Sequence, residues 1–324
     1  MFLAGQVDSL RSMRKKVNVP VFILAGGLGT RISEETHLKP KPMIEIGDTP
    51  VLLHLMRWYY SFGFDDFVIC AGYRSWEIKN FFLNYEFRAN HLVIDHRASV
   101  NQAPGVLGVN TRQEKWRVRV IDTGLETMTG ARLARALDEI GQCGIDTGEF
   151  FSDFALTYGD GLCDIDLAQE LQFHYAHGGI GTVLGVPPVA RFGELDISAD
   201  SKVLGFLEKP ENRQGLINGG FFFFKTAFRE YLSTENDCVL ERNPLSSLAH
   251  DKQLSVYKHH GFWQPMDTLR DKLKLQDLWD SGRAPWGVTH DSPAAVSVFS
   301  PAENGTSEQR LQQKDDAVFV GNPG

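Results

Sequence analysis

The sequence is short of three features that would define its class at once. Only four cysteines occur among 324 residues, with no Cys-x-x-Cys pair, so neither a disulfide framework nor a zinc site is expected. Free thiols in a reducing, cytoplasmic compartment fit this spacing better. No apolar run is long enough to cross a membrane, and the basic residues near the start follow the apolar ones, the reverse of a signal peptide. Positive charge is also scarce: the formal net charge is −8, which argues against nucleic acid or an anionic membrane as partner.

The apolar residues that are present predict a single α/β domain. The length suffices for a substantial core, and the apolar content of 42% is ordinary for a globular protein. Short apolar runs alternate with segments of helical spacing, which is typical of βαβ units around a parallel sheet. The predicted strands are 21–25, 66–71, 116–121, 154–158, 181–186, 192–197 and 203–207, and helices are predicted over 50–62, 76–82 and 166–176 and from 130 onward.

The two ends of the chain fall outside this pattern. Residues 1–18 are interpreted as an N-terminal extension and 19–287 as the domain. Residues 288–324 are rich in Ser, Pro, Asn, Gln and Gly with little periodicity, which predicts a disordered tail. Inside the domain, residues 101–111 are rich in turn formers, and we expect them to form a loop.

A glycine-rich loop after the first strand is the strongest functional signal. Val21–Ala25 is a continuous apolar run, and three glycines follow it within residues 26–29, so that backbone N–H groups could approach an anion closely. Arg31 and Lys41 add positive charge, the latter between two prolines, and together they predict phosphate binding. The loop is neither a P-loop, because no Gly-Lys-Ser/Thr follows, nor the dinucleotide fingerprint, because Ile32 replaces its third glycine. A plain glycine turn beside solvated lysines is the alternative.

Asp160 stands between two glycines directly after the predicted strand 154–158. Ligands gather beyond the carboxyl ends of parallel strands, and Mg²⁺ takes one or two carboxylates together with phosphate oxygens. Asp160 is therefore a candidate magnesium ligand, with an Asx turn as the alternative. A second anion or base contact is predicted at Thr127 and Arg132, where a helix begins, with an ordinary threonine cap as the alternative.

These motifs resemble the signature of the sugar-phosphate nucleotidyltransferases: Gly-x-Gly-Thr-Arg, then a lysine beside a proline ten positions after Arg31. The spacer 33–36 with its doubled Lys-Pro, and the stretch Trp-Gln-Pro-Met-Asp-Thr at 263–268, resemble the cytidylyltransferase branch of that family. The resemblance spans roughly residues 19–286. It implies a Rossmann-like three-layer nucleotidyltransferase fold with a mixed, mainly parallel central sheet, and a role in nucleotide-sugar and lipopolysaccharide O-antigen biosynthesis.

The resemblance also implies the residues of the site. Catalytic residues would be Arg31, Lys41 and Asp160. Nucleotide contacts would come from Leu24, Ala25, Gly26, Gly27, Leu28, Gly29, Thr30, Arg31, Lys41, Thr127, Arg132 and Gly159. Sugar-phosphate contacts would come from Glu208, Lys209, Asn218 and Gly219, and Mg²⁺ would be held by Asp160 and Asp267.

The residues themselves leave alternatives at two of these places. A solvated strand end is the alternative for 208–210, and a helix N-cap is the alternative for Asp267, since an apolar helical pattern follows it. His259 and His260 lie nearby with no third ligand in view, so we expect surface residues there rather than metal ligands.

The function that the resemblance implies is transfer of a cytidylyl group from CTP to α-D-glucose 1-phosphate, with Mg²⁺ as cofactor. Alternatives are a uridylyl- or thymidylyltransferase acting on a hexose 1-phosphate, and a non-catalytic sensor of nucleotide or sugar phosphate on the same fold. The sensor would be expected to have lost a charged site residue, whereas every site position is filled. A homo-oligomer without nucleic-acid or membrane partners is expected.

Overall fold

The computed structural model describes residues 16–29, 32, 36, 39–89, 91–93, 105–107, 114–147, 150–188, 194–199, 202–207 and 215–287. The elements are β1 (Val21–Ala25), η2 (Lys41–Met43), β2 (Glu45–Ile46), β3 (Thr49–Pro50), α3 (Val51–Ser61), β4 (Asp66–Ala71), α4 (Ser75–Leu83), α5 (Tyr85–Ala89), β5 (His91–Val93), β6 (Gly105–Leu107), β7 (Arg117–Asp122), α6 (Thr129–Thr147), β8 (Asp153–Tyr158), β9 (Gly161–Cys163), α7 (Leu167–His177), β10 (Gly181–Val186), β11 (Glu194–Ile197), β12 (Val203–Leu207), β13 (Ile217–Lys225), η3 (Thr226–Tyr231), α8 (Asn243–His250), β14 (Leu254–Lys258), β15 (Trp263–Pro265) and α9 (Leu269–Asp280).

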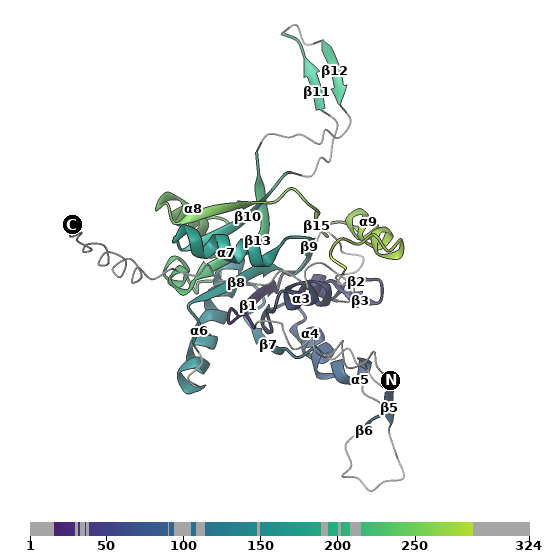
Figure 1. The fold of residues 1–324 in the computed structure, drawn as a ribbon, viewed down its shortest axis with the longest axis vertical. Helices are drawn as coiled ribbons and strands as arrows, with labels where there is room; N and C mark the ends of the chain where they lie inside the picture. Colours follow the sequence, from purple (N-terminus) through teal and green to yellow (C-terminus); the bar gives the residue numbers. More distant parts are fainter. Residues whose placement is uncertain are drawn as a thin grey trace, which may run out of the picture.

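A seven-stranded sheet runs through the middle of the molecule, in the order β14-β10-β13-β8-β1-β4-β7 (Figure 1). Strand β13 is antiparallel to both of its neighbours, β10 and β8. The other neighbours pair in parallel. The prediction of a mixed, mainly parallel sheet is therefore confirmed.

Helices cover both faces of this sheet, which makes three layers. Alternate residues of β1 face opposite sides of the sheet, because successive side chains of a strand point in opposite directions. Val21 and Ile23 pack with helices α3, α4 and α7 on one face. Phe22 and Leu24 pack with α6 and α8 on the other face. The four successive phenylalanines of β13 divide between the two faces in the same way, and all are buried. The run of aromatics therefore belongs to the core of the sheet.

A smaller cluster lies beyond one end of the sheet. Strands β9 and β15 pair there as an antiparallel ribbon, and Ile44, Leu162, Met266 and Leu275 bury their side chains together beside it. Trp286 is 1% exposed in the same cluster, so the described fold continues up to the predicted end of the domain. The predicted tail, 288–324, lies outside the described residues.

Two of the predicted boundaries differ in the structure, and several elements, among them α5, α8, β14 and β15, were not predicted. Val17 forms a bridge with Phe64, and its N–H donates to the Gly63 carbonyl at 3.1 Å, so contacts with the domain begin before residue 19. Within the predicted loop 101–111, Gly105–Leu107 forms strand β6, because its backbone pairs with β5. Strands β11 and β12 lie within the predicted strands 192–197 and 203–207, and they pair as an antiparallel hairpin that projects from the sheet (Figure 1). No helix among the described residues is long and apolar enough to span a membrane.

Candidate active site

The glycine loop leaves β1 at its carboxyl end and packs on one side only. Gly29 has a φ of +65°, a conformation that a side chain disfavours, and a Cβ there would lie 2.6 Å from Cγ2 of Thr36 and 3.3 Å from Cβ of Lys41. A Cβ on Gly26 would collide with the guanidinium of Arg132. Around Gly27, by contrast, nothing described lies within 4 Å of such an atom. The loop therefore has a packed side and an open side where an anion could approach.

Lys41 meets two aspartates next to this loop. Its Nζ lies 2.5 Å from Oδ2 of Asp160 and 2.8 Å from Oδ1 of Asp267. The three side chains are 12%, 28% and 23% exposed, respectively, so they are largely shielded from water. Burial alone would lower the pKa of Lys41, but the charges of both carboxylates and the hydrogen bonds to them outweigh it and raise that pKa. The ammonium is thus charged at neutral pH.

The fold brings these residues together from distant parts of the chain. Asp160 follows β8 and Asp267 follows β15, at 119 and 226 positions from Lys41. The ribbon joins them: Pro265 pairs with Gly161, and the N–H of Met266 donates to the Asp160 carbonyl at 2.8 Å. Lys41 arrives from the other side in the short helix η2, which Pro40 and Pro42 restrict.

Two alternatives from the sequence can be compared with this geometry. The N-cap of α9 is Thr268, not Asp267, since the Thr268 side chain accepts from the N–H of Asp271. Lys39, the other lysine of the Lys-Pro repeat, pairs with Glu45 at 2.9 Å on the surface. The carboxylate of Asp267 is therefore not used as a helix cap, and the lysine that meets the two aspartates is Lys41, not Lys39.

Arg132 lies beneath the loop. It is 4% exposed, and its guanidinium donates to the carbonyls of Gly124 and Leu125 at 2.5 and 3.0 Å and to the hydroxyl of Thr123 at 3.0 Å. Burial lowers its pKa. Thr127, the other predicted nucleotide contact of this segment, accepts from Nη1 of Arg135 at 2.9 Å. Both polar side chains are thus engaged in internal hydrogen bonds, and of the two it is Arg132 that contacts the glycine loop, at Gly26.

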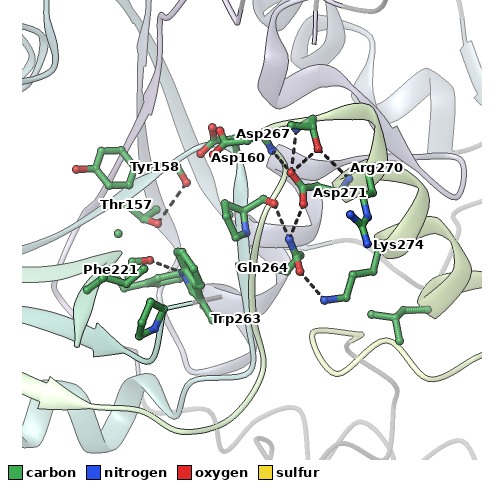
Figure 2. Close-up of a pocket in the computed structure, with 18 of the residues that line it drawn as sticks. Thr157, Tyr158, Asp160, Phe221, Trp263, Gln264, Asp267, Arg270, Asp271 and Lys274 are labelled. Atoms are coloured by element: carbon green, nitrogen blue, oxygen red, sulfur yellow. Dashed lines mark hydrogen bonds between the residues drawn. The ribbon is translucent and has the colours of Figure 1, made fainter. Parts of the chain in front are cut away.

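A cavity of about 1190 Å³ opens on the other side of the aspartates, between β13, β15 and α9 (Figure 2). Asp160 and Asp267 line it, together with Asn218 and Gly219, the predicted sugar-facing residues. Trp263 also lines it and donates from its indole N–H to the Gly219 carbonyl at 2.7 Å, which fixes this glycine backbone. In the sequence Trp263 stands out only as part of the stretch 263–268, and no local pattern indicates its bond to Gly219.

The remaining predicted site residues are of two kinds: some lie among the described residues and four do not. The Leu24 carbonyl accepts from the N–H of Gly159 at 3.0 Å, so the end of β1 is bonded directly to the segment that carries Asp160. Ala25 and Leu28 belong to the end of β1 and the loop. The predicted residues Thr30, Arg31, Glu208 and Lys209 lie outside the described residues.

His259 departs from the surface position that we expected. Its Nε2 pairs with Oδ1 of Asp164 at 2.9 Å, and its side chain is 14% exposed. Cys163 lies close enough that the three potential ligand atoms are within 4.8 Å of one another. His260 is exposed as expected. Cys70, Cys163 and Cys238 are free thiols, as predicted.

Comparison with known proteins identifies the family to which this arrangement belongs. A family model described as nucleotidyl transferase matches residues 20–271, more than half of the chain. The chain belongs to the nucleotidyl transferase family. It is 43% identical over 271 residues to a glucose-1-phosphate cytidylyltransferase of Salmonella typhi, covering 82% of this chain and 97% of that relative. It is 37% identical over 266 residues to a probable glucose-1-phosphate cytidylyltransferase of Bacillus subtilis, covering 82% and 98%. The resemblance to the cytidylyltransferase branch is confirmed.

Solved structures support this nucleotidyl transferase fold. A UDP-glucose pyrophosphorylase complexed with UDP-glucose matches with a TM-score of 0.56 at 17% identity, over 82% of this chain and 99% of that one. HddC from Yersinia pseudotuberculosis, complexed with GMP-PN, matches with a TM-score of 0.54 at 21% identity, over 81% and 99%. At these identities the likeness shows the fold alone.

The nucleotidyl transferase family generally uses a divalent metal. The side chains of this chain fit such an ion, because the carboxylates of Asp160 and Asp267 both contact one cationic group, the Lys41 ammonium. Two carboxylates against one ammonium also leave a net negative charge, which favours a further cation.

Proposed function

We propose that this chain transfers a cytidylyl group from CTP to α-D-glucose 1-phosphate, giving CDP-glucose and pyrophosphate. The relatives named glucose-1-phosphate cytidylyltransferase, 43% identical across 82% of the chain, support this choice of substrates. The observation that carries the chemistry is the meeting of Lys41 with Asp160 and Asp267 beside the glycine loop.

In this reaction a phosphate oxygen of glucose 1-phosphate attacks the α-phosphorus of CTP in line. The bond from that phosphorus to the bridging oxygen breaks, and pyrophosphate leaves with the electron pair. The attacking oxygen is already ionised at neutral pH, so no general base is required. What the protein must supply is position and neutralisation of negative charge.

Lys41 is suited to the charge that builds on the α-phosphate. Its pKa is raised, so the ammonium is present across the neutral range. It is also largely buried, which strengthens its electrostatic effect on a bound phosphate. The open backbone around Gly27 would offer N–H groups to the phosphates of CTP. We further assign Arg31 to the leaving pyrophosphate, Glu208 to sugar hydroxyls and Lys209 to the sugar phosphate.

Asp160 and Asp267 would hold the divalent cation, and we assign Mg²⁺, whose preferred ligands are carboxylate and phosphate oxygens. When bound, the ion would screen the repulsion between two anionic reactants. The two aspartates would hold that charge at the edge of the cavity that Asn218 and Gly219 also line. Nucleotide on one side and sugar phosphate on the other would then meet at the aspartates.

The base can be tested directly. Cytosine presents an amine donor where uracil presents a carbonyl acceptor, and a mispaired buried polar group costs about 1–3 kcal/mol. We therefore expect kcat/KM for CTP to exceed that for UTP by about tenfold or more, measured as pyrophosphate release with glucose 1-phosphate and each of CTP, UTP, dTTP and ATP. Equal values for CTP and UTP would refute the cytidylyl assignment but leave nucleotidyl transfer standing. No release with any of the four would favour the non-catalytic sensor.

A further inference from the structure

The backbone of Asp267 is held by a side chain to which the proposed reaction assigns no role. Asp271, in the first turn of α9, accepts on Oδ2 from the N–H of Asp267 at 3.2 Å and from the N–H of Thr268 at 3.0 Å. The Thr268 hydroxyl donates to the same oxygen at 2.8 Å. One carboxylate oxygen of Asp271 thus accepts three hydrogen bonds from the two residues that precede the helix.

An ordinary capping box explains only part of this arrangement. In that motif the N-cap hydroxyl accepts from the backbone N–H of the third helical residue, whose side chain accepts from the N-cap N–H. Thr268 and Asp271 make both bonds. The bond from the N–H of Asp267 reaches one residue outside the helix, to the residue whose carboxylate stands 2.8 Å from Lys41. It is not one of the two bonds of the capping box, and it restrains the backbone of Asp267.

Asp271 is itself held in place. Its Oδ1 accepts from Nε2 of Gln264 at 3.1 Å, and Oε1 of Gln264 accepts from Nζ of Lys274 at 2.7 Å (Figure 2). Gln264 is 2% exposed and lies in β15, which pairs with β9 directly after Asp160. The carboxylate of Asp271 is therefore fixed relative to both segments that carry the aspartates.

We propose that Asp271 is a positioning residue for Asp267. By holding the N–H of Asp267, it sets where the carboxylate of Asp267 stands relative to that of Asp160. This inference rests on the proposed function, in which the two carboxylates hold one divalent cation. Removing a residue that orients a metal ligand typically changes metal affinity or activity by about 10- to 100-fold.

The test compares variants of the full chain for binding of Mn²⁺ alone, measured by loss of the EPR signal of the free ion. Asp271→Ala is expected to raise the Kd about tenfold or more. The Mg²⁺ concentration that half-saturates pyrophosphate release should rise with it, while kcat at saturating Mg²⁺ recovers toward wild type. Asp271→Asn keeps the shape and one accepting oxygen, so it should fall between wild type and Asp271→Ala.

Gly282→Ala is the matched control. Gly282 lies just beyond the other end of α9 with a φ of +67°, so alanine there strains the helix end without touching Asp267. Its Kd for Mn²⁺ should equal that of wild type.

Two results would overturn the positioning role. One is an Asp271→Ala protein that binds Mn²⁺ as tightly as Gly282→Ala, which would reduce Asp271 to a helix cap. If Asp271→Ala does not fold, the same comparison is made with Asp271→Asn. The other is failure of the proposed function, which is distinguishable: wild type would release no pyrophosphate, or Asp267→Asn would bind Mn²⁺ like wild type.

Discussion

Glu170, a buried carboxyl group on α7, allows a quantitative test of the packing of the core. It is fully buried on α7, and neither carboxylate oxygen has a hydrogen-bond partner among the described residues. Burial raises its pKa from 4.5 to about 8, so the folded protein holds it protonated at neutral pH. The titratable groups on which the charge of Glu170 would act are Tyr59, Cys163 and Tyr257. The pKa values of these three groups are also raised, chiefly by burial, so they stay neutral in the same range.

The sign of the pH dependence follows from this shift. Below about pH 4.5 the carboxyl is protonated in both states and the full stability is present. Between 4.5 and about 8 the unfolded chain releases the proton while the folded protein keeps it, so the free energy of unfolding falls as pH rises. The shift corresponds to roughly 5 kcal/mol at most, against a typical total stability of about 5–15 kcal/mol.

Glu170→Gln should remove this dependence, because glutamine has nearly the shape of the protonated side chain and never ionises. Urea unfolding at pH 5, 6.5 and 8.5 measures the effect. At pH 5 the variant should match wild type within about 1 kcal/mol, and at pH 8.5 it should be the more stable protein. Glu139→Gln, on the exposed side of α6, is the control and should follow wild type at every pH. Parallel curves for wild type and Glu170→Gln would refute the buried, protonated carboxyl.

Three further sets of variants test the site and the limits of the fold. Lys41→Ala should lower kcat by about 10²- to 10³-fold with the fold intact. The control Lys39→Ala loses only an exposed ion pair with Glu45, so its kcat should stay within about twofold of wild type. Near-normal turnover in Lys41→Ala would remove Lys41 from the mechanism. Asp160→Asn and Asp267→Asn should each cut the rate strongly, and the double variant should be little worse than either one; multiplicative losses would indicate two independent sites. Trp286→Ala should lower the free energy of unfolding by about 3–5 kcal/mol. Deletion of the predicted tail, by contrast, should leave the Tm unchanged. A fall in Tm of several degrees on deletion would show that the tail packs on the protein.

The elements and the glycine loop could be predicted from local patterns. Strands Asp66–Ala71 and Gly181–Val186 coincide with the predicted residues, because an apolar run of this length reports a strand buried on both faces. The glycine loop is recognisable from its composition, and at Gly26 and Gly29 the backbone passes so close to Arg132 and Thr36 that a side chain has no room. Lys41 was placed in the site by its spacing from the loop, and that spacing is short.

Which distant residues meet was decided by the tertiary structure. Asp267 lies 226 positions from Lys41 and reaches it because β9 and β15 pair, a contact that no local pattern announces. Arg132 was predicted as a ligand contact because a helix begins there, and in the structure its guanidinium packs against Gly26. Asp271 is the third residue of a helix by its position in the sequence, and its carboxylate accepts a hydrogen bond from the backbone N–H of Asp267. Propensity and periodicity act over a few residues, so they determine helices, strands and turns. The pairing of remote strands and the burial of single polar groups depend on the packing free energy of the whole chain, which only the folded arrangement expresses.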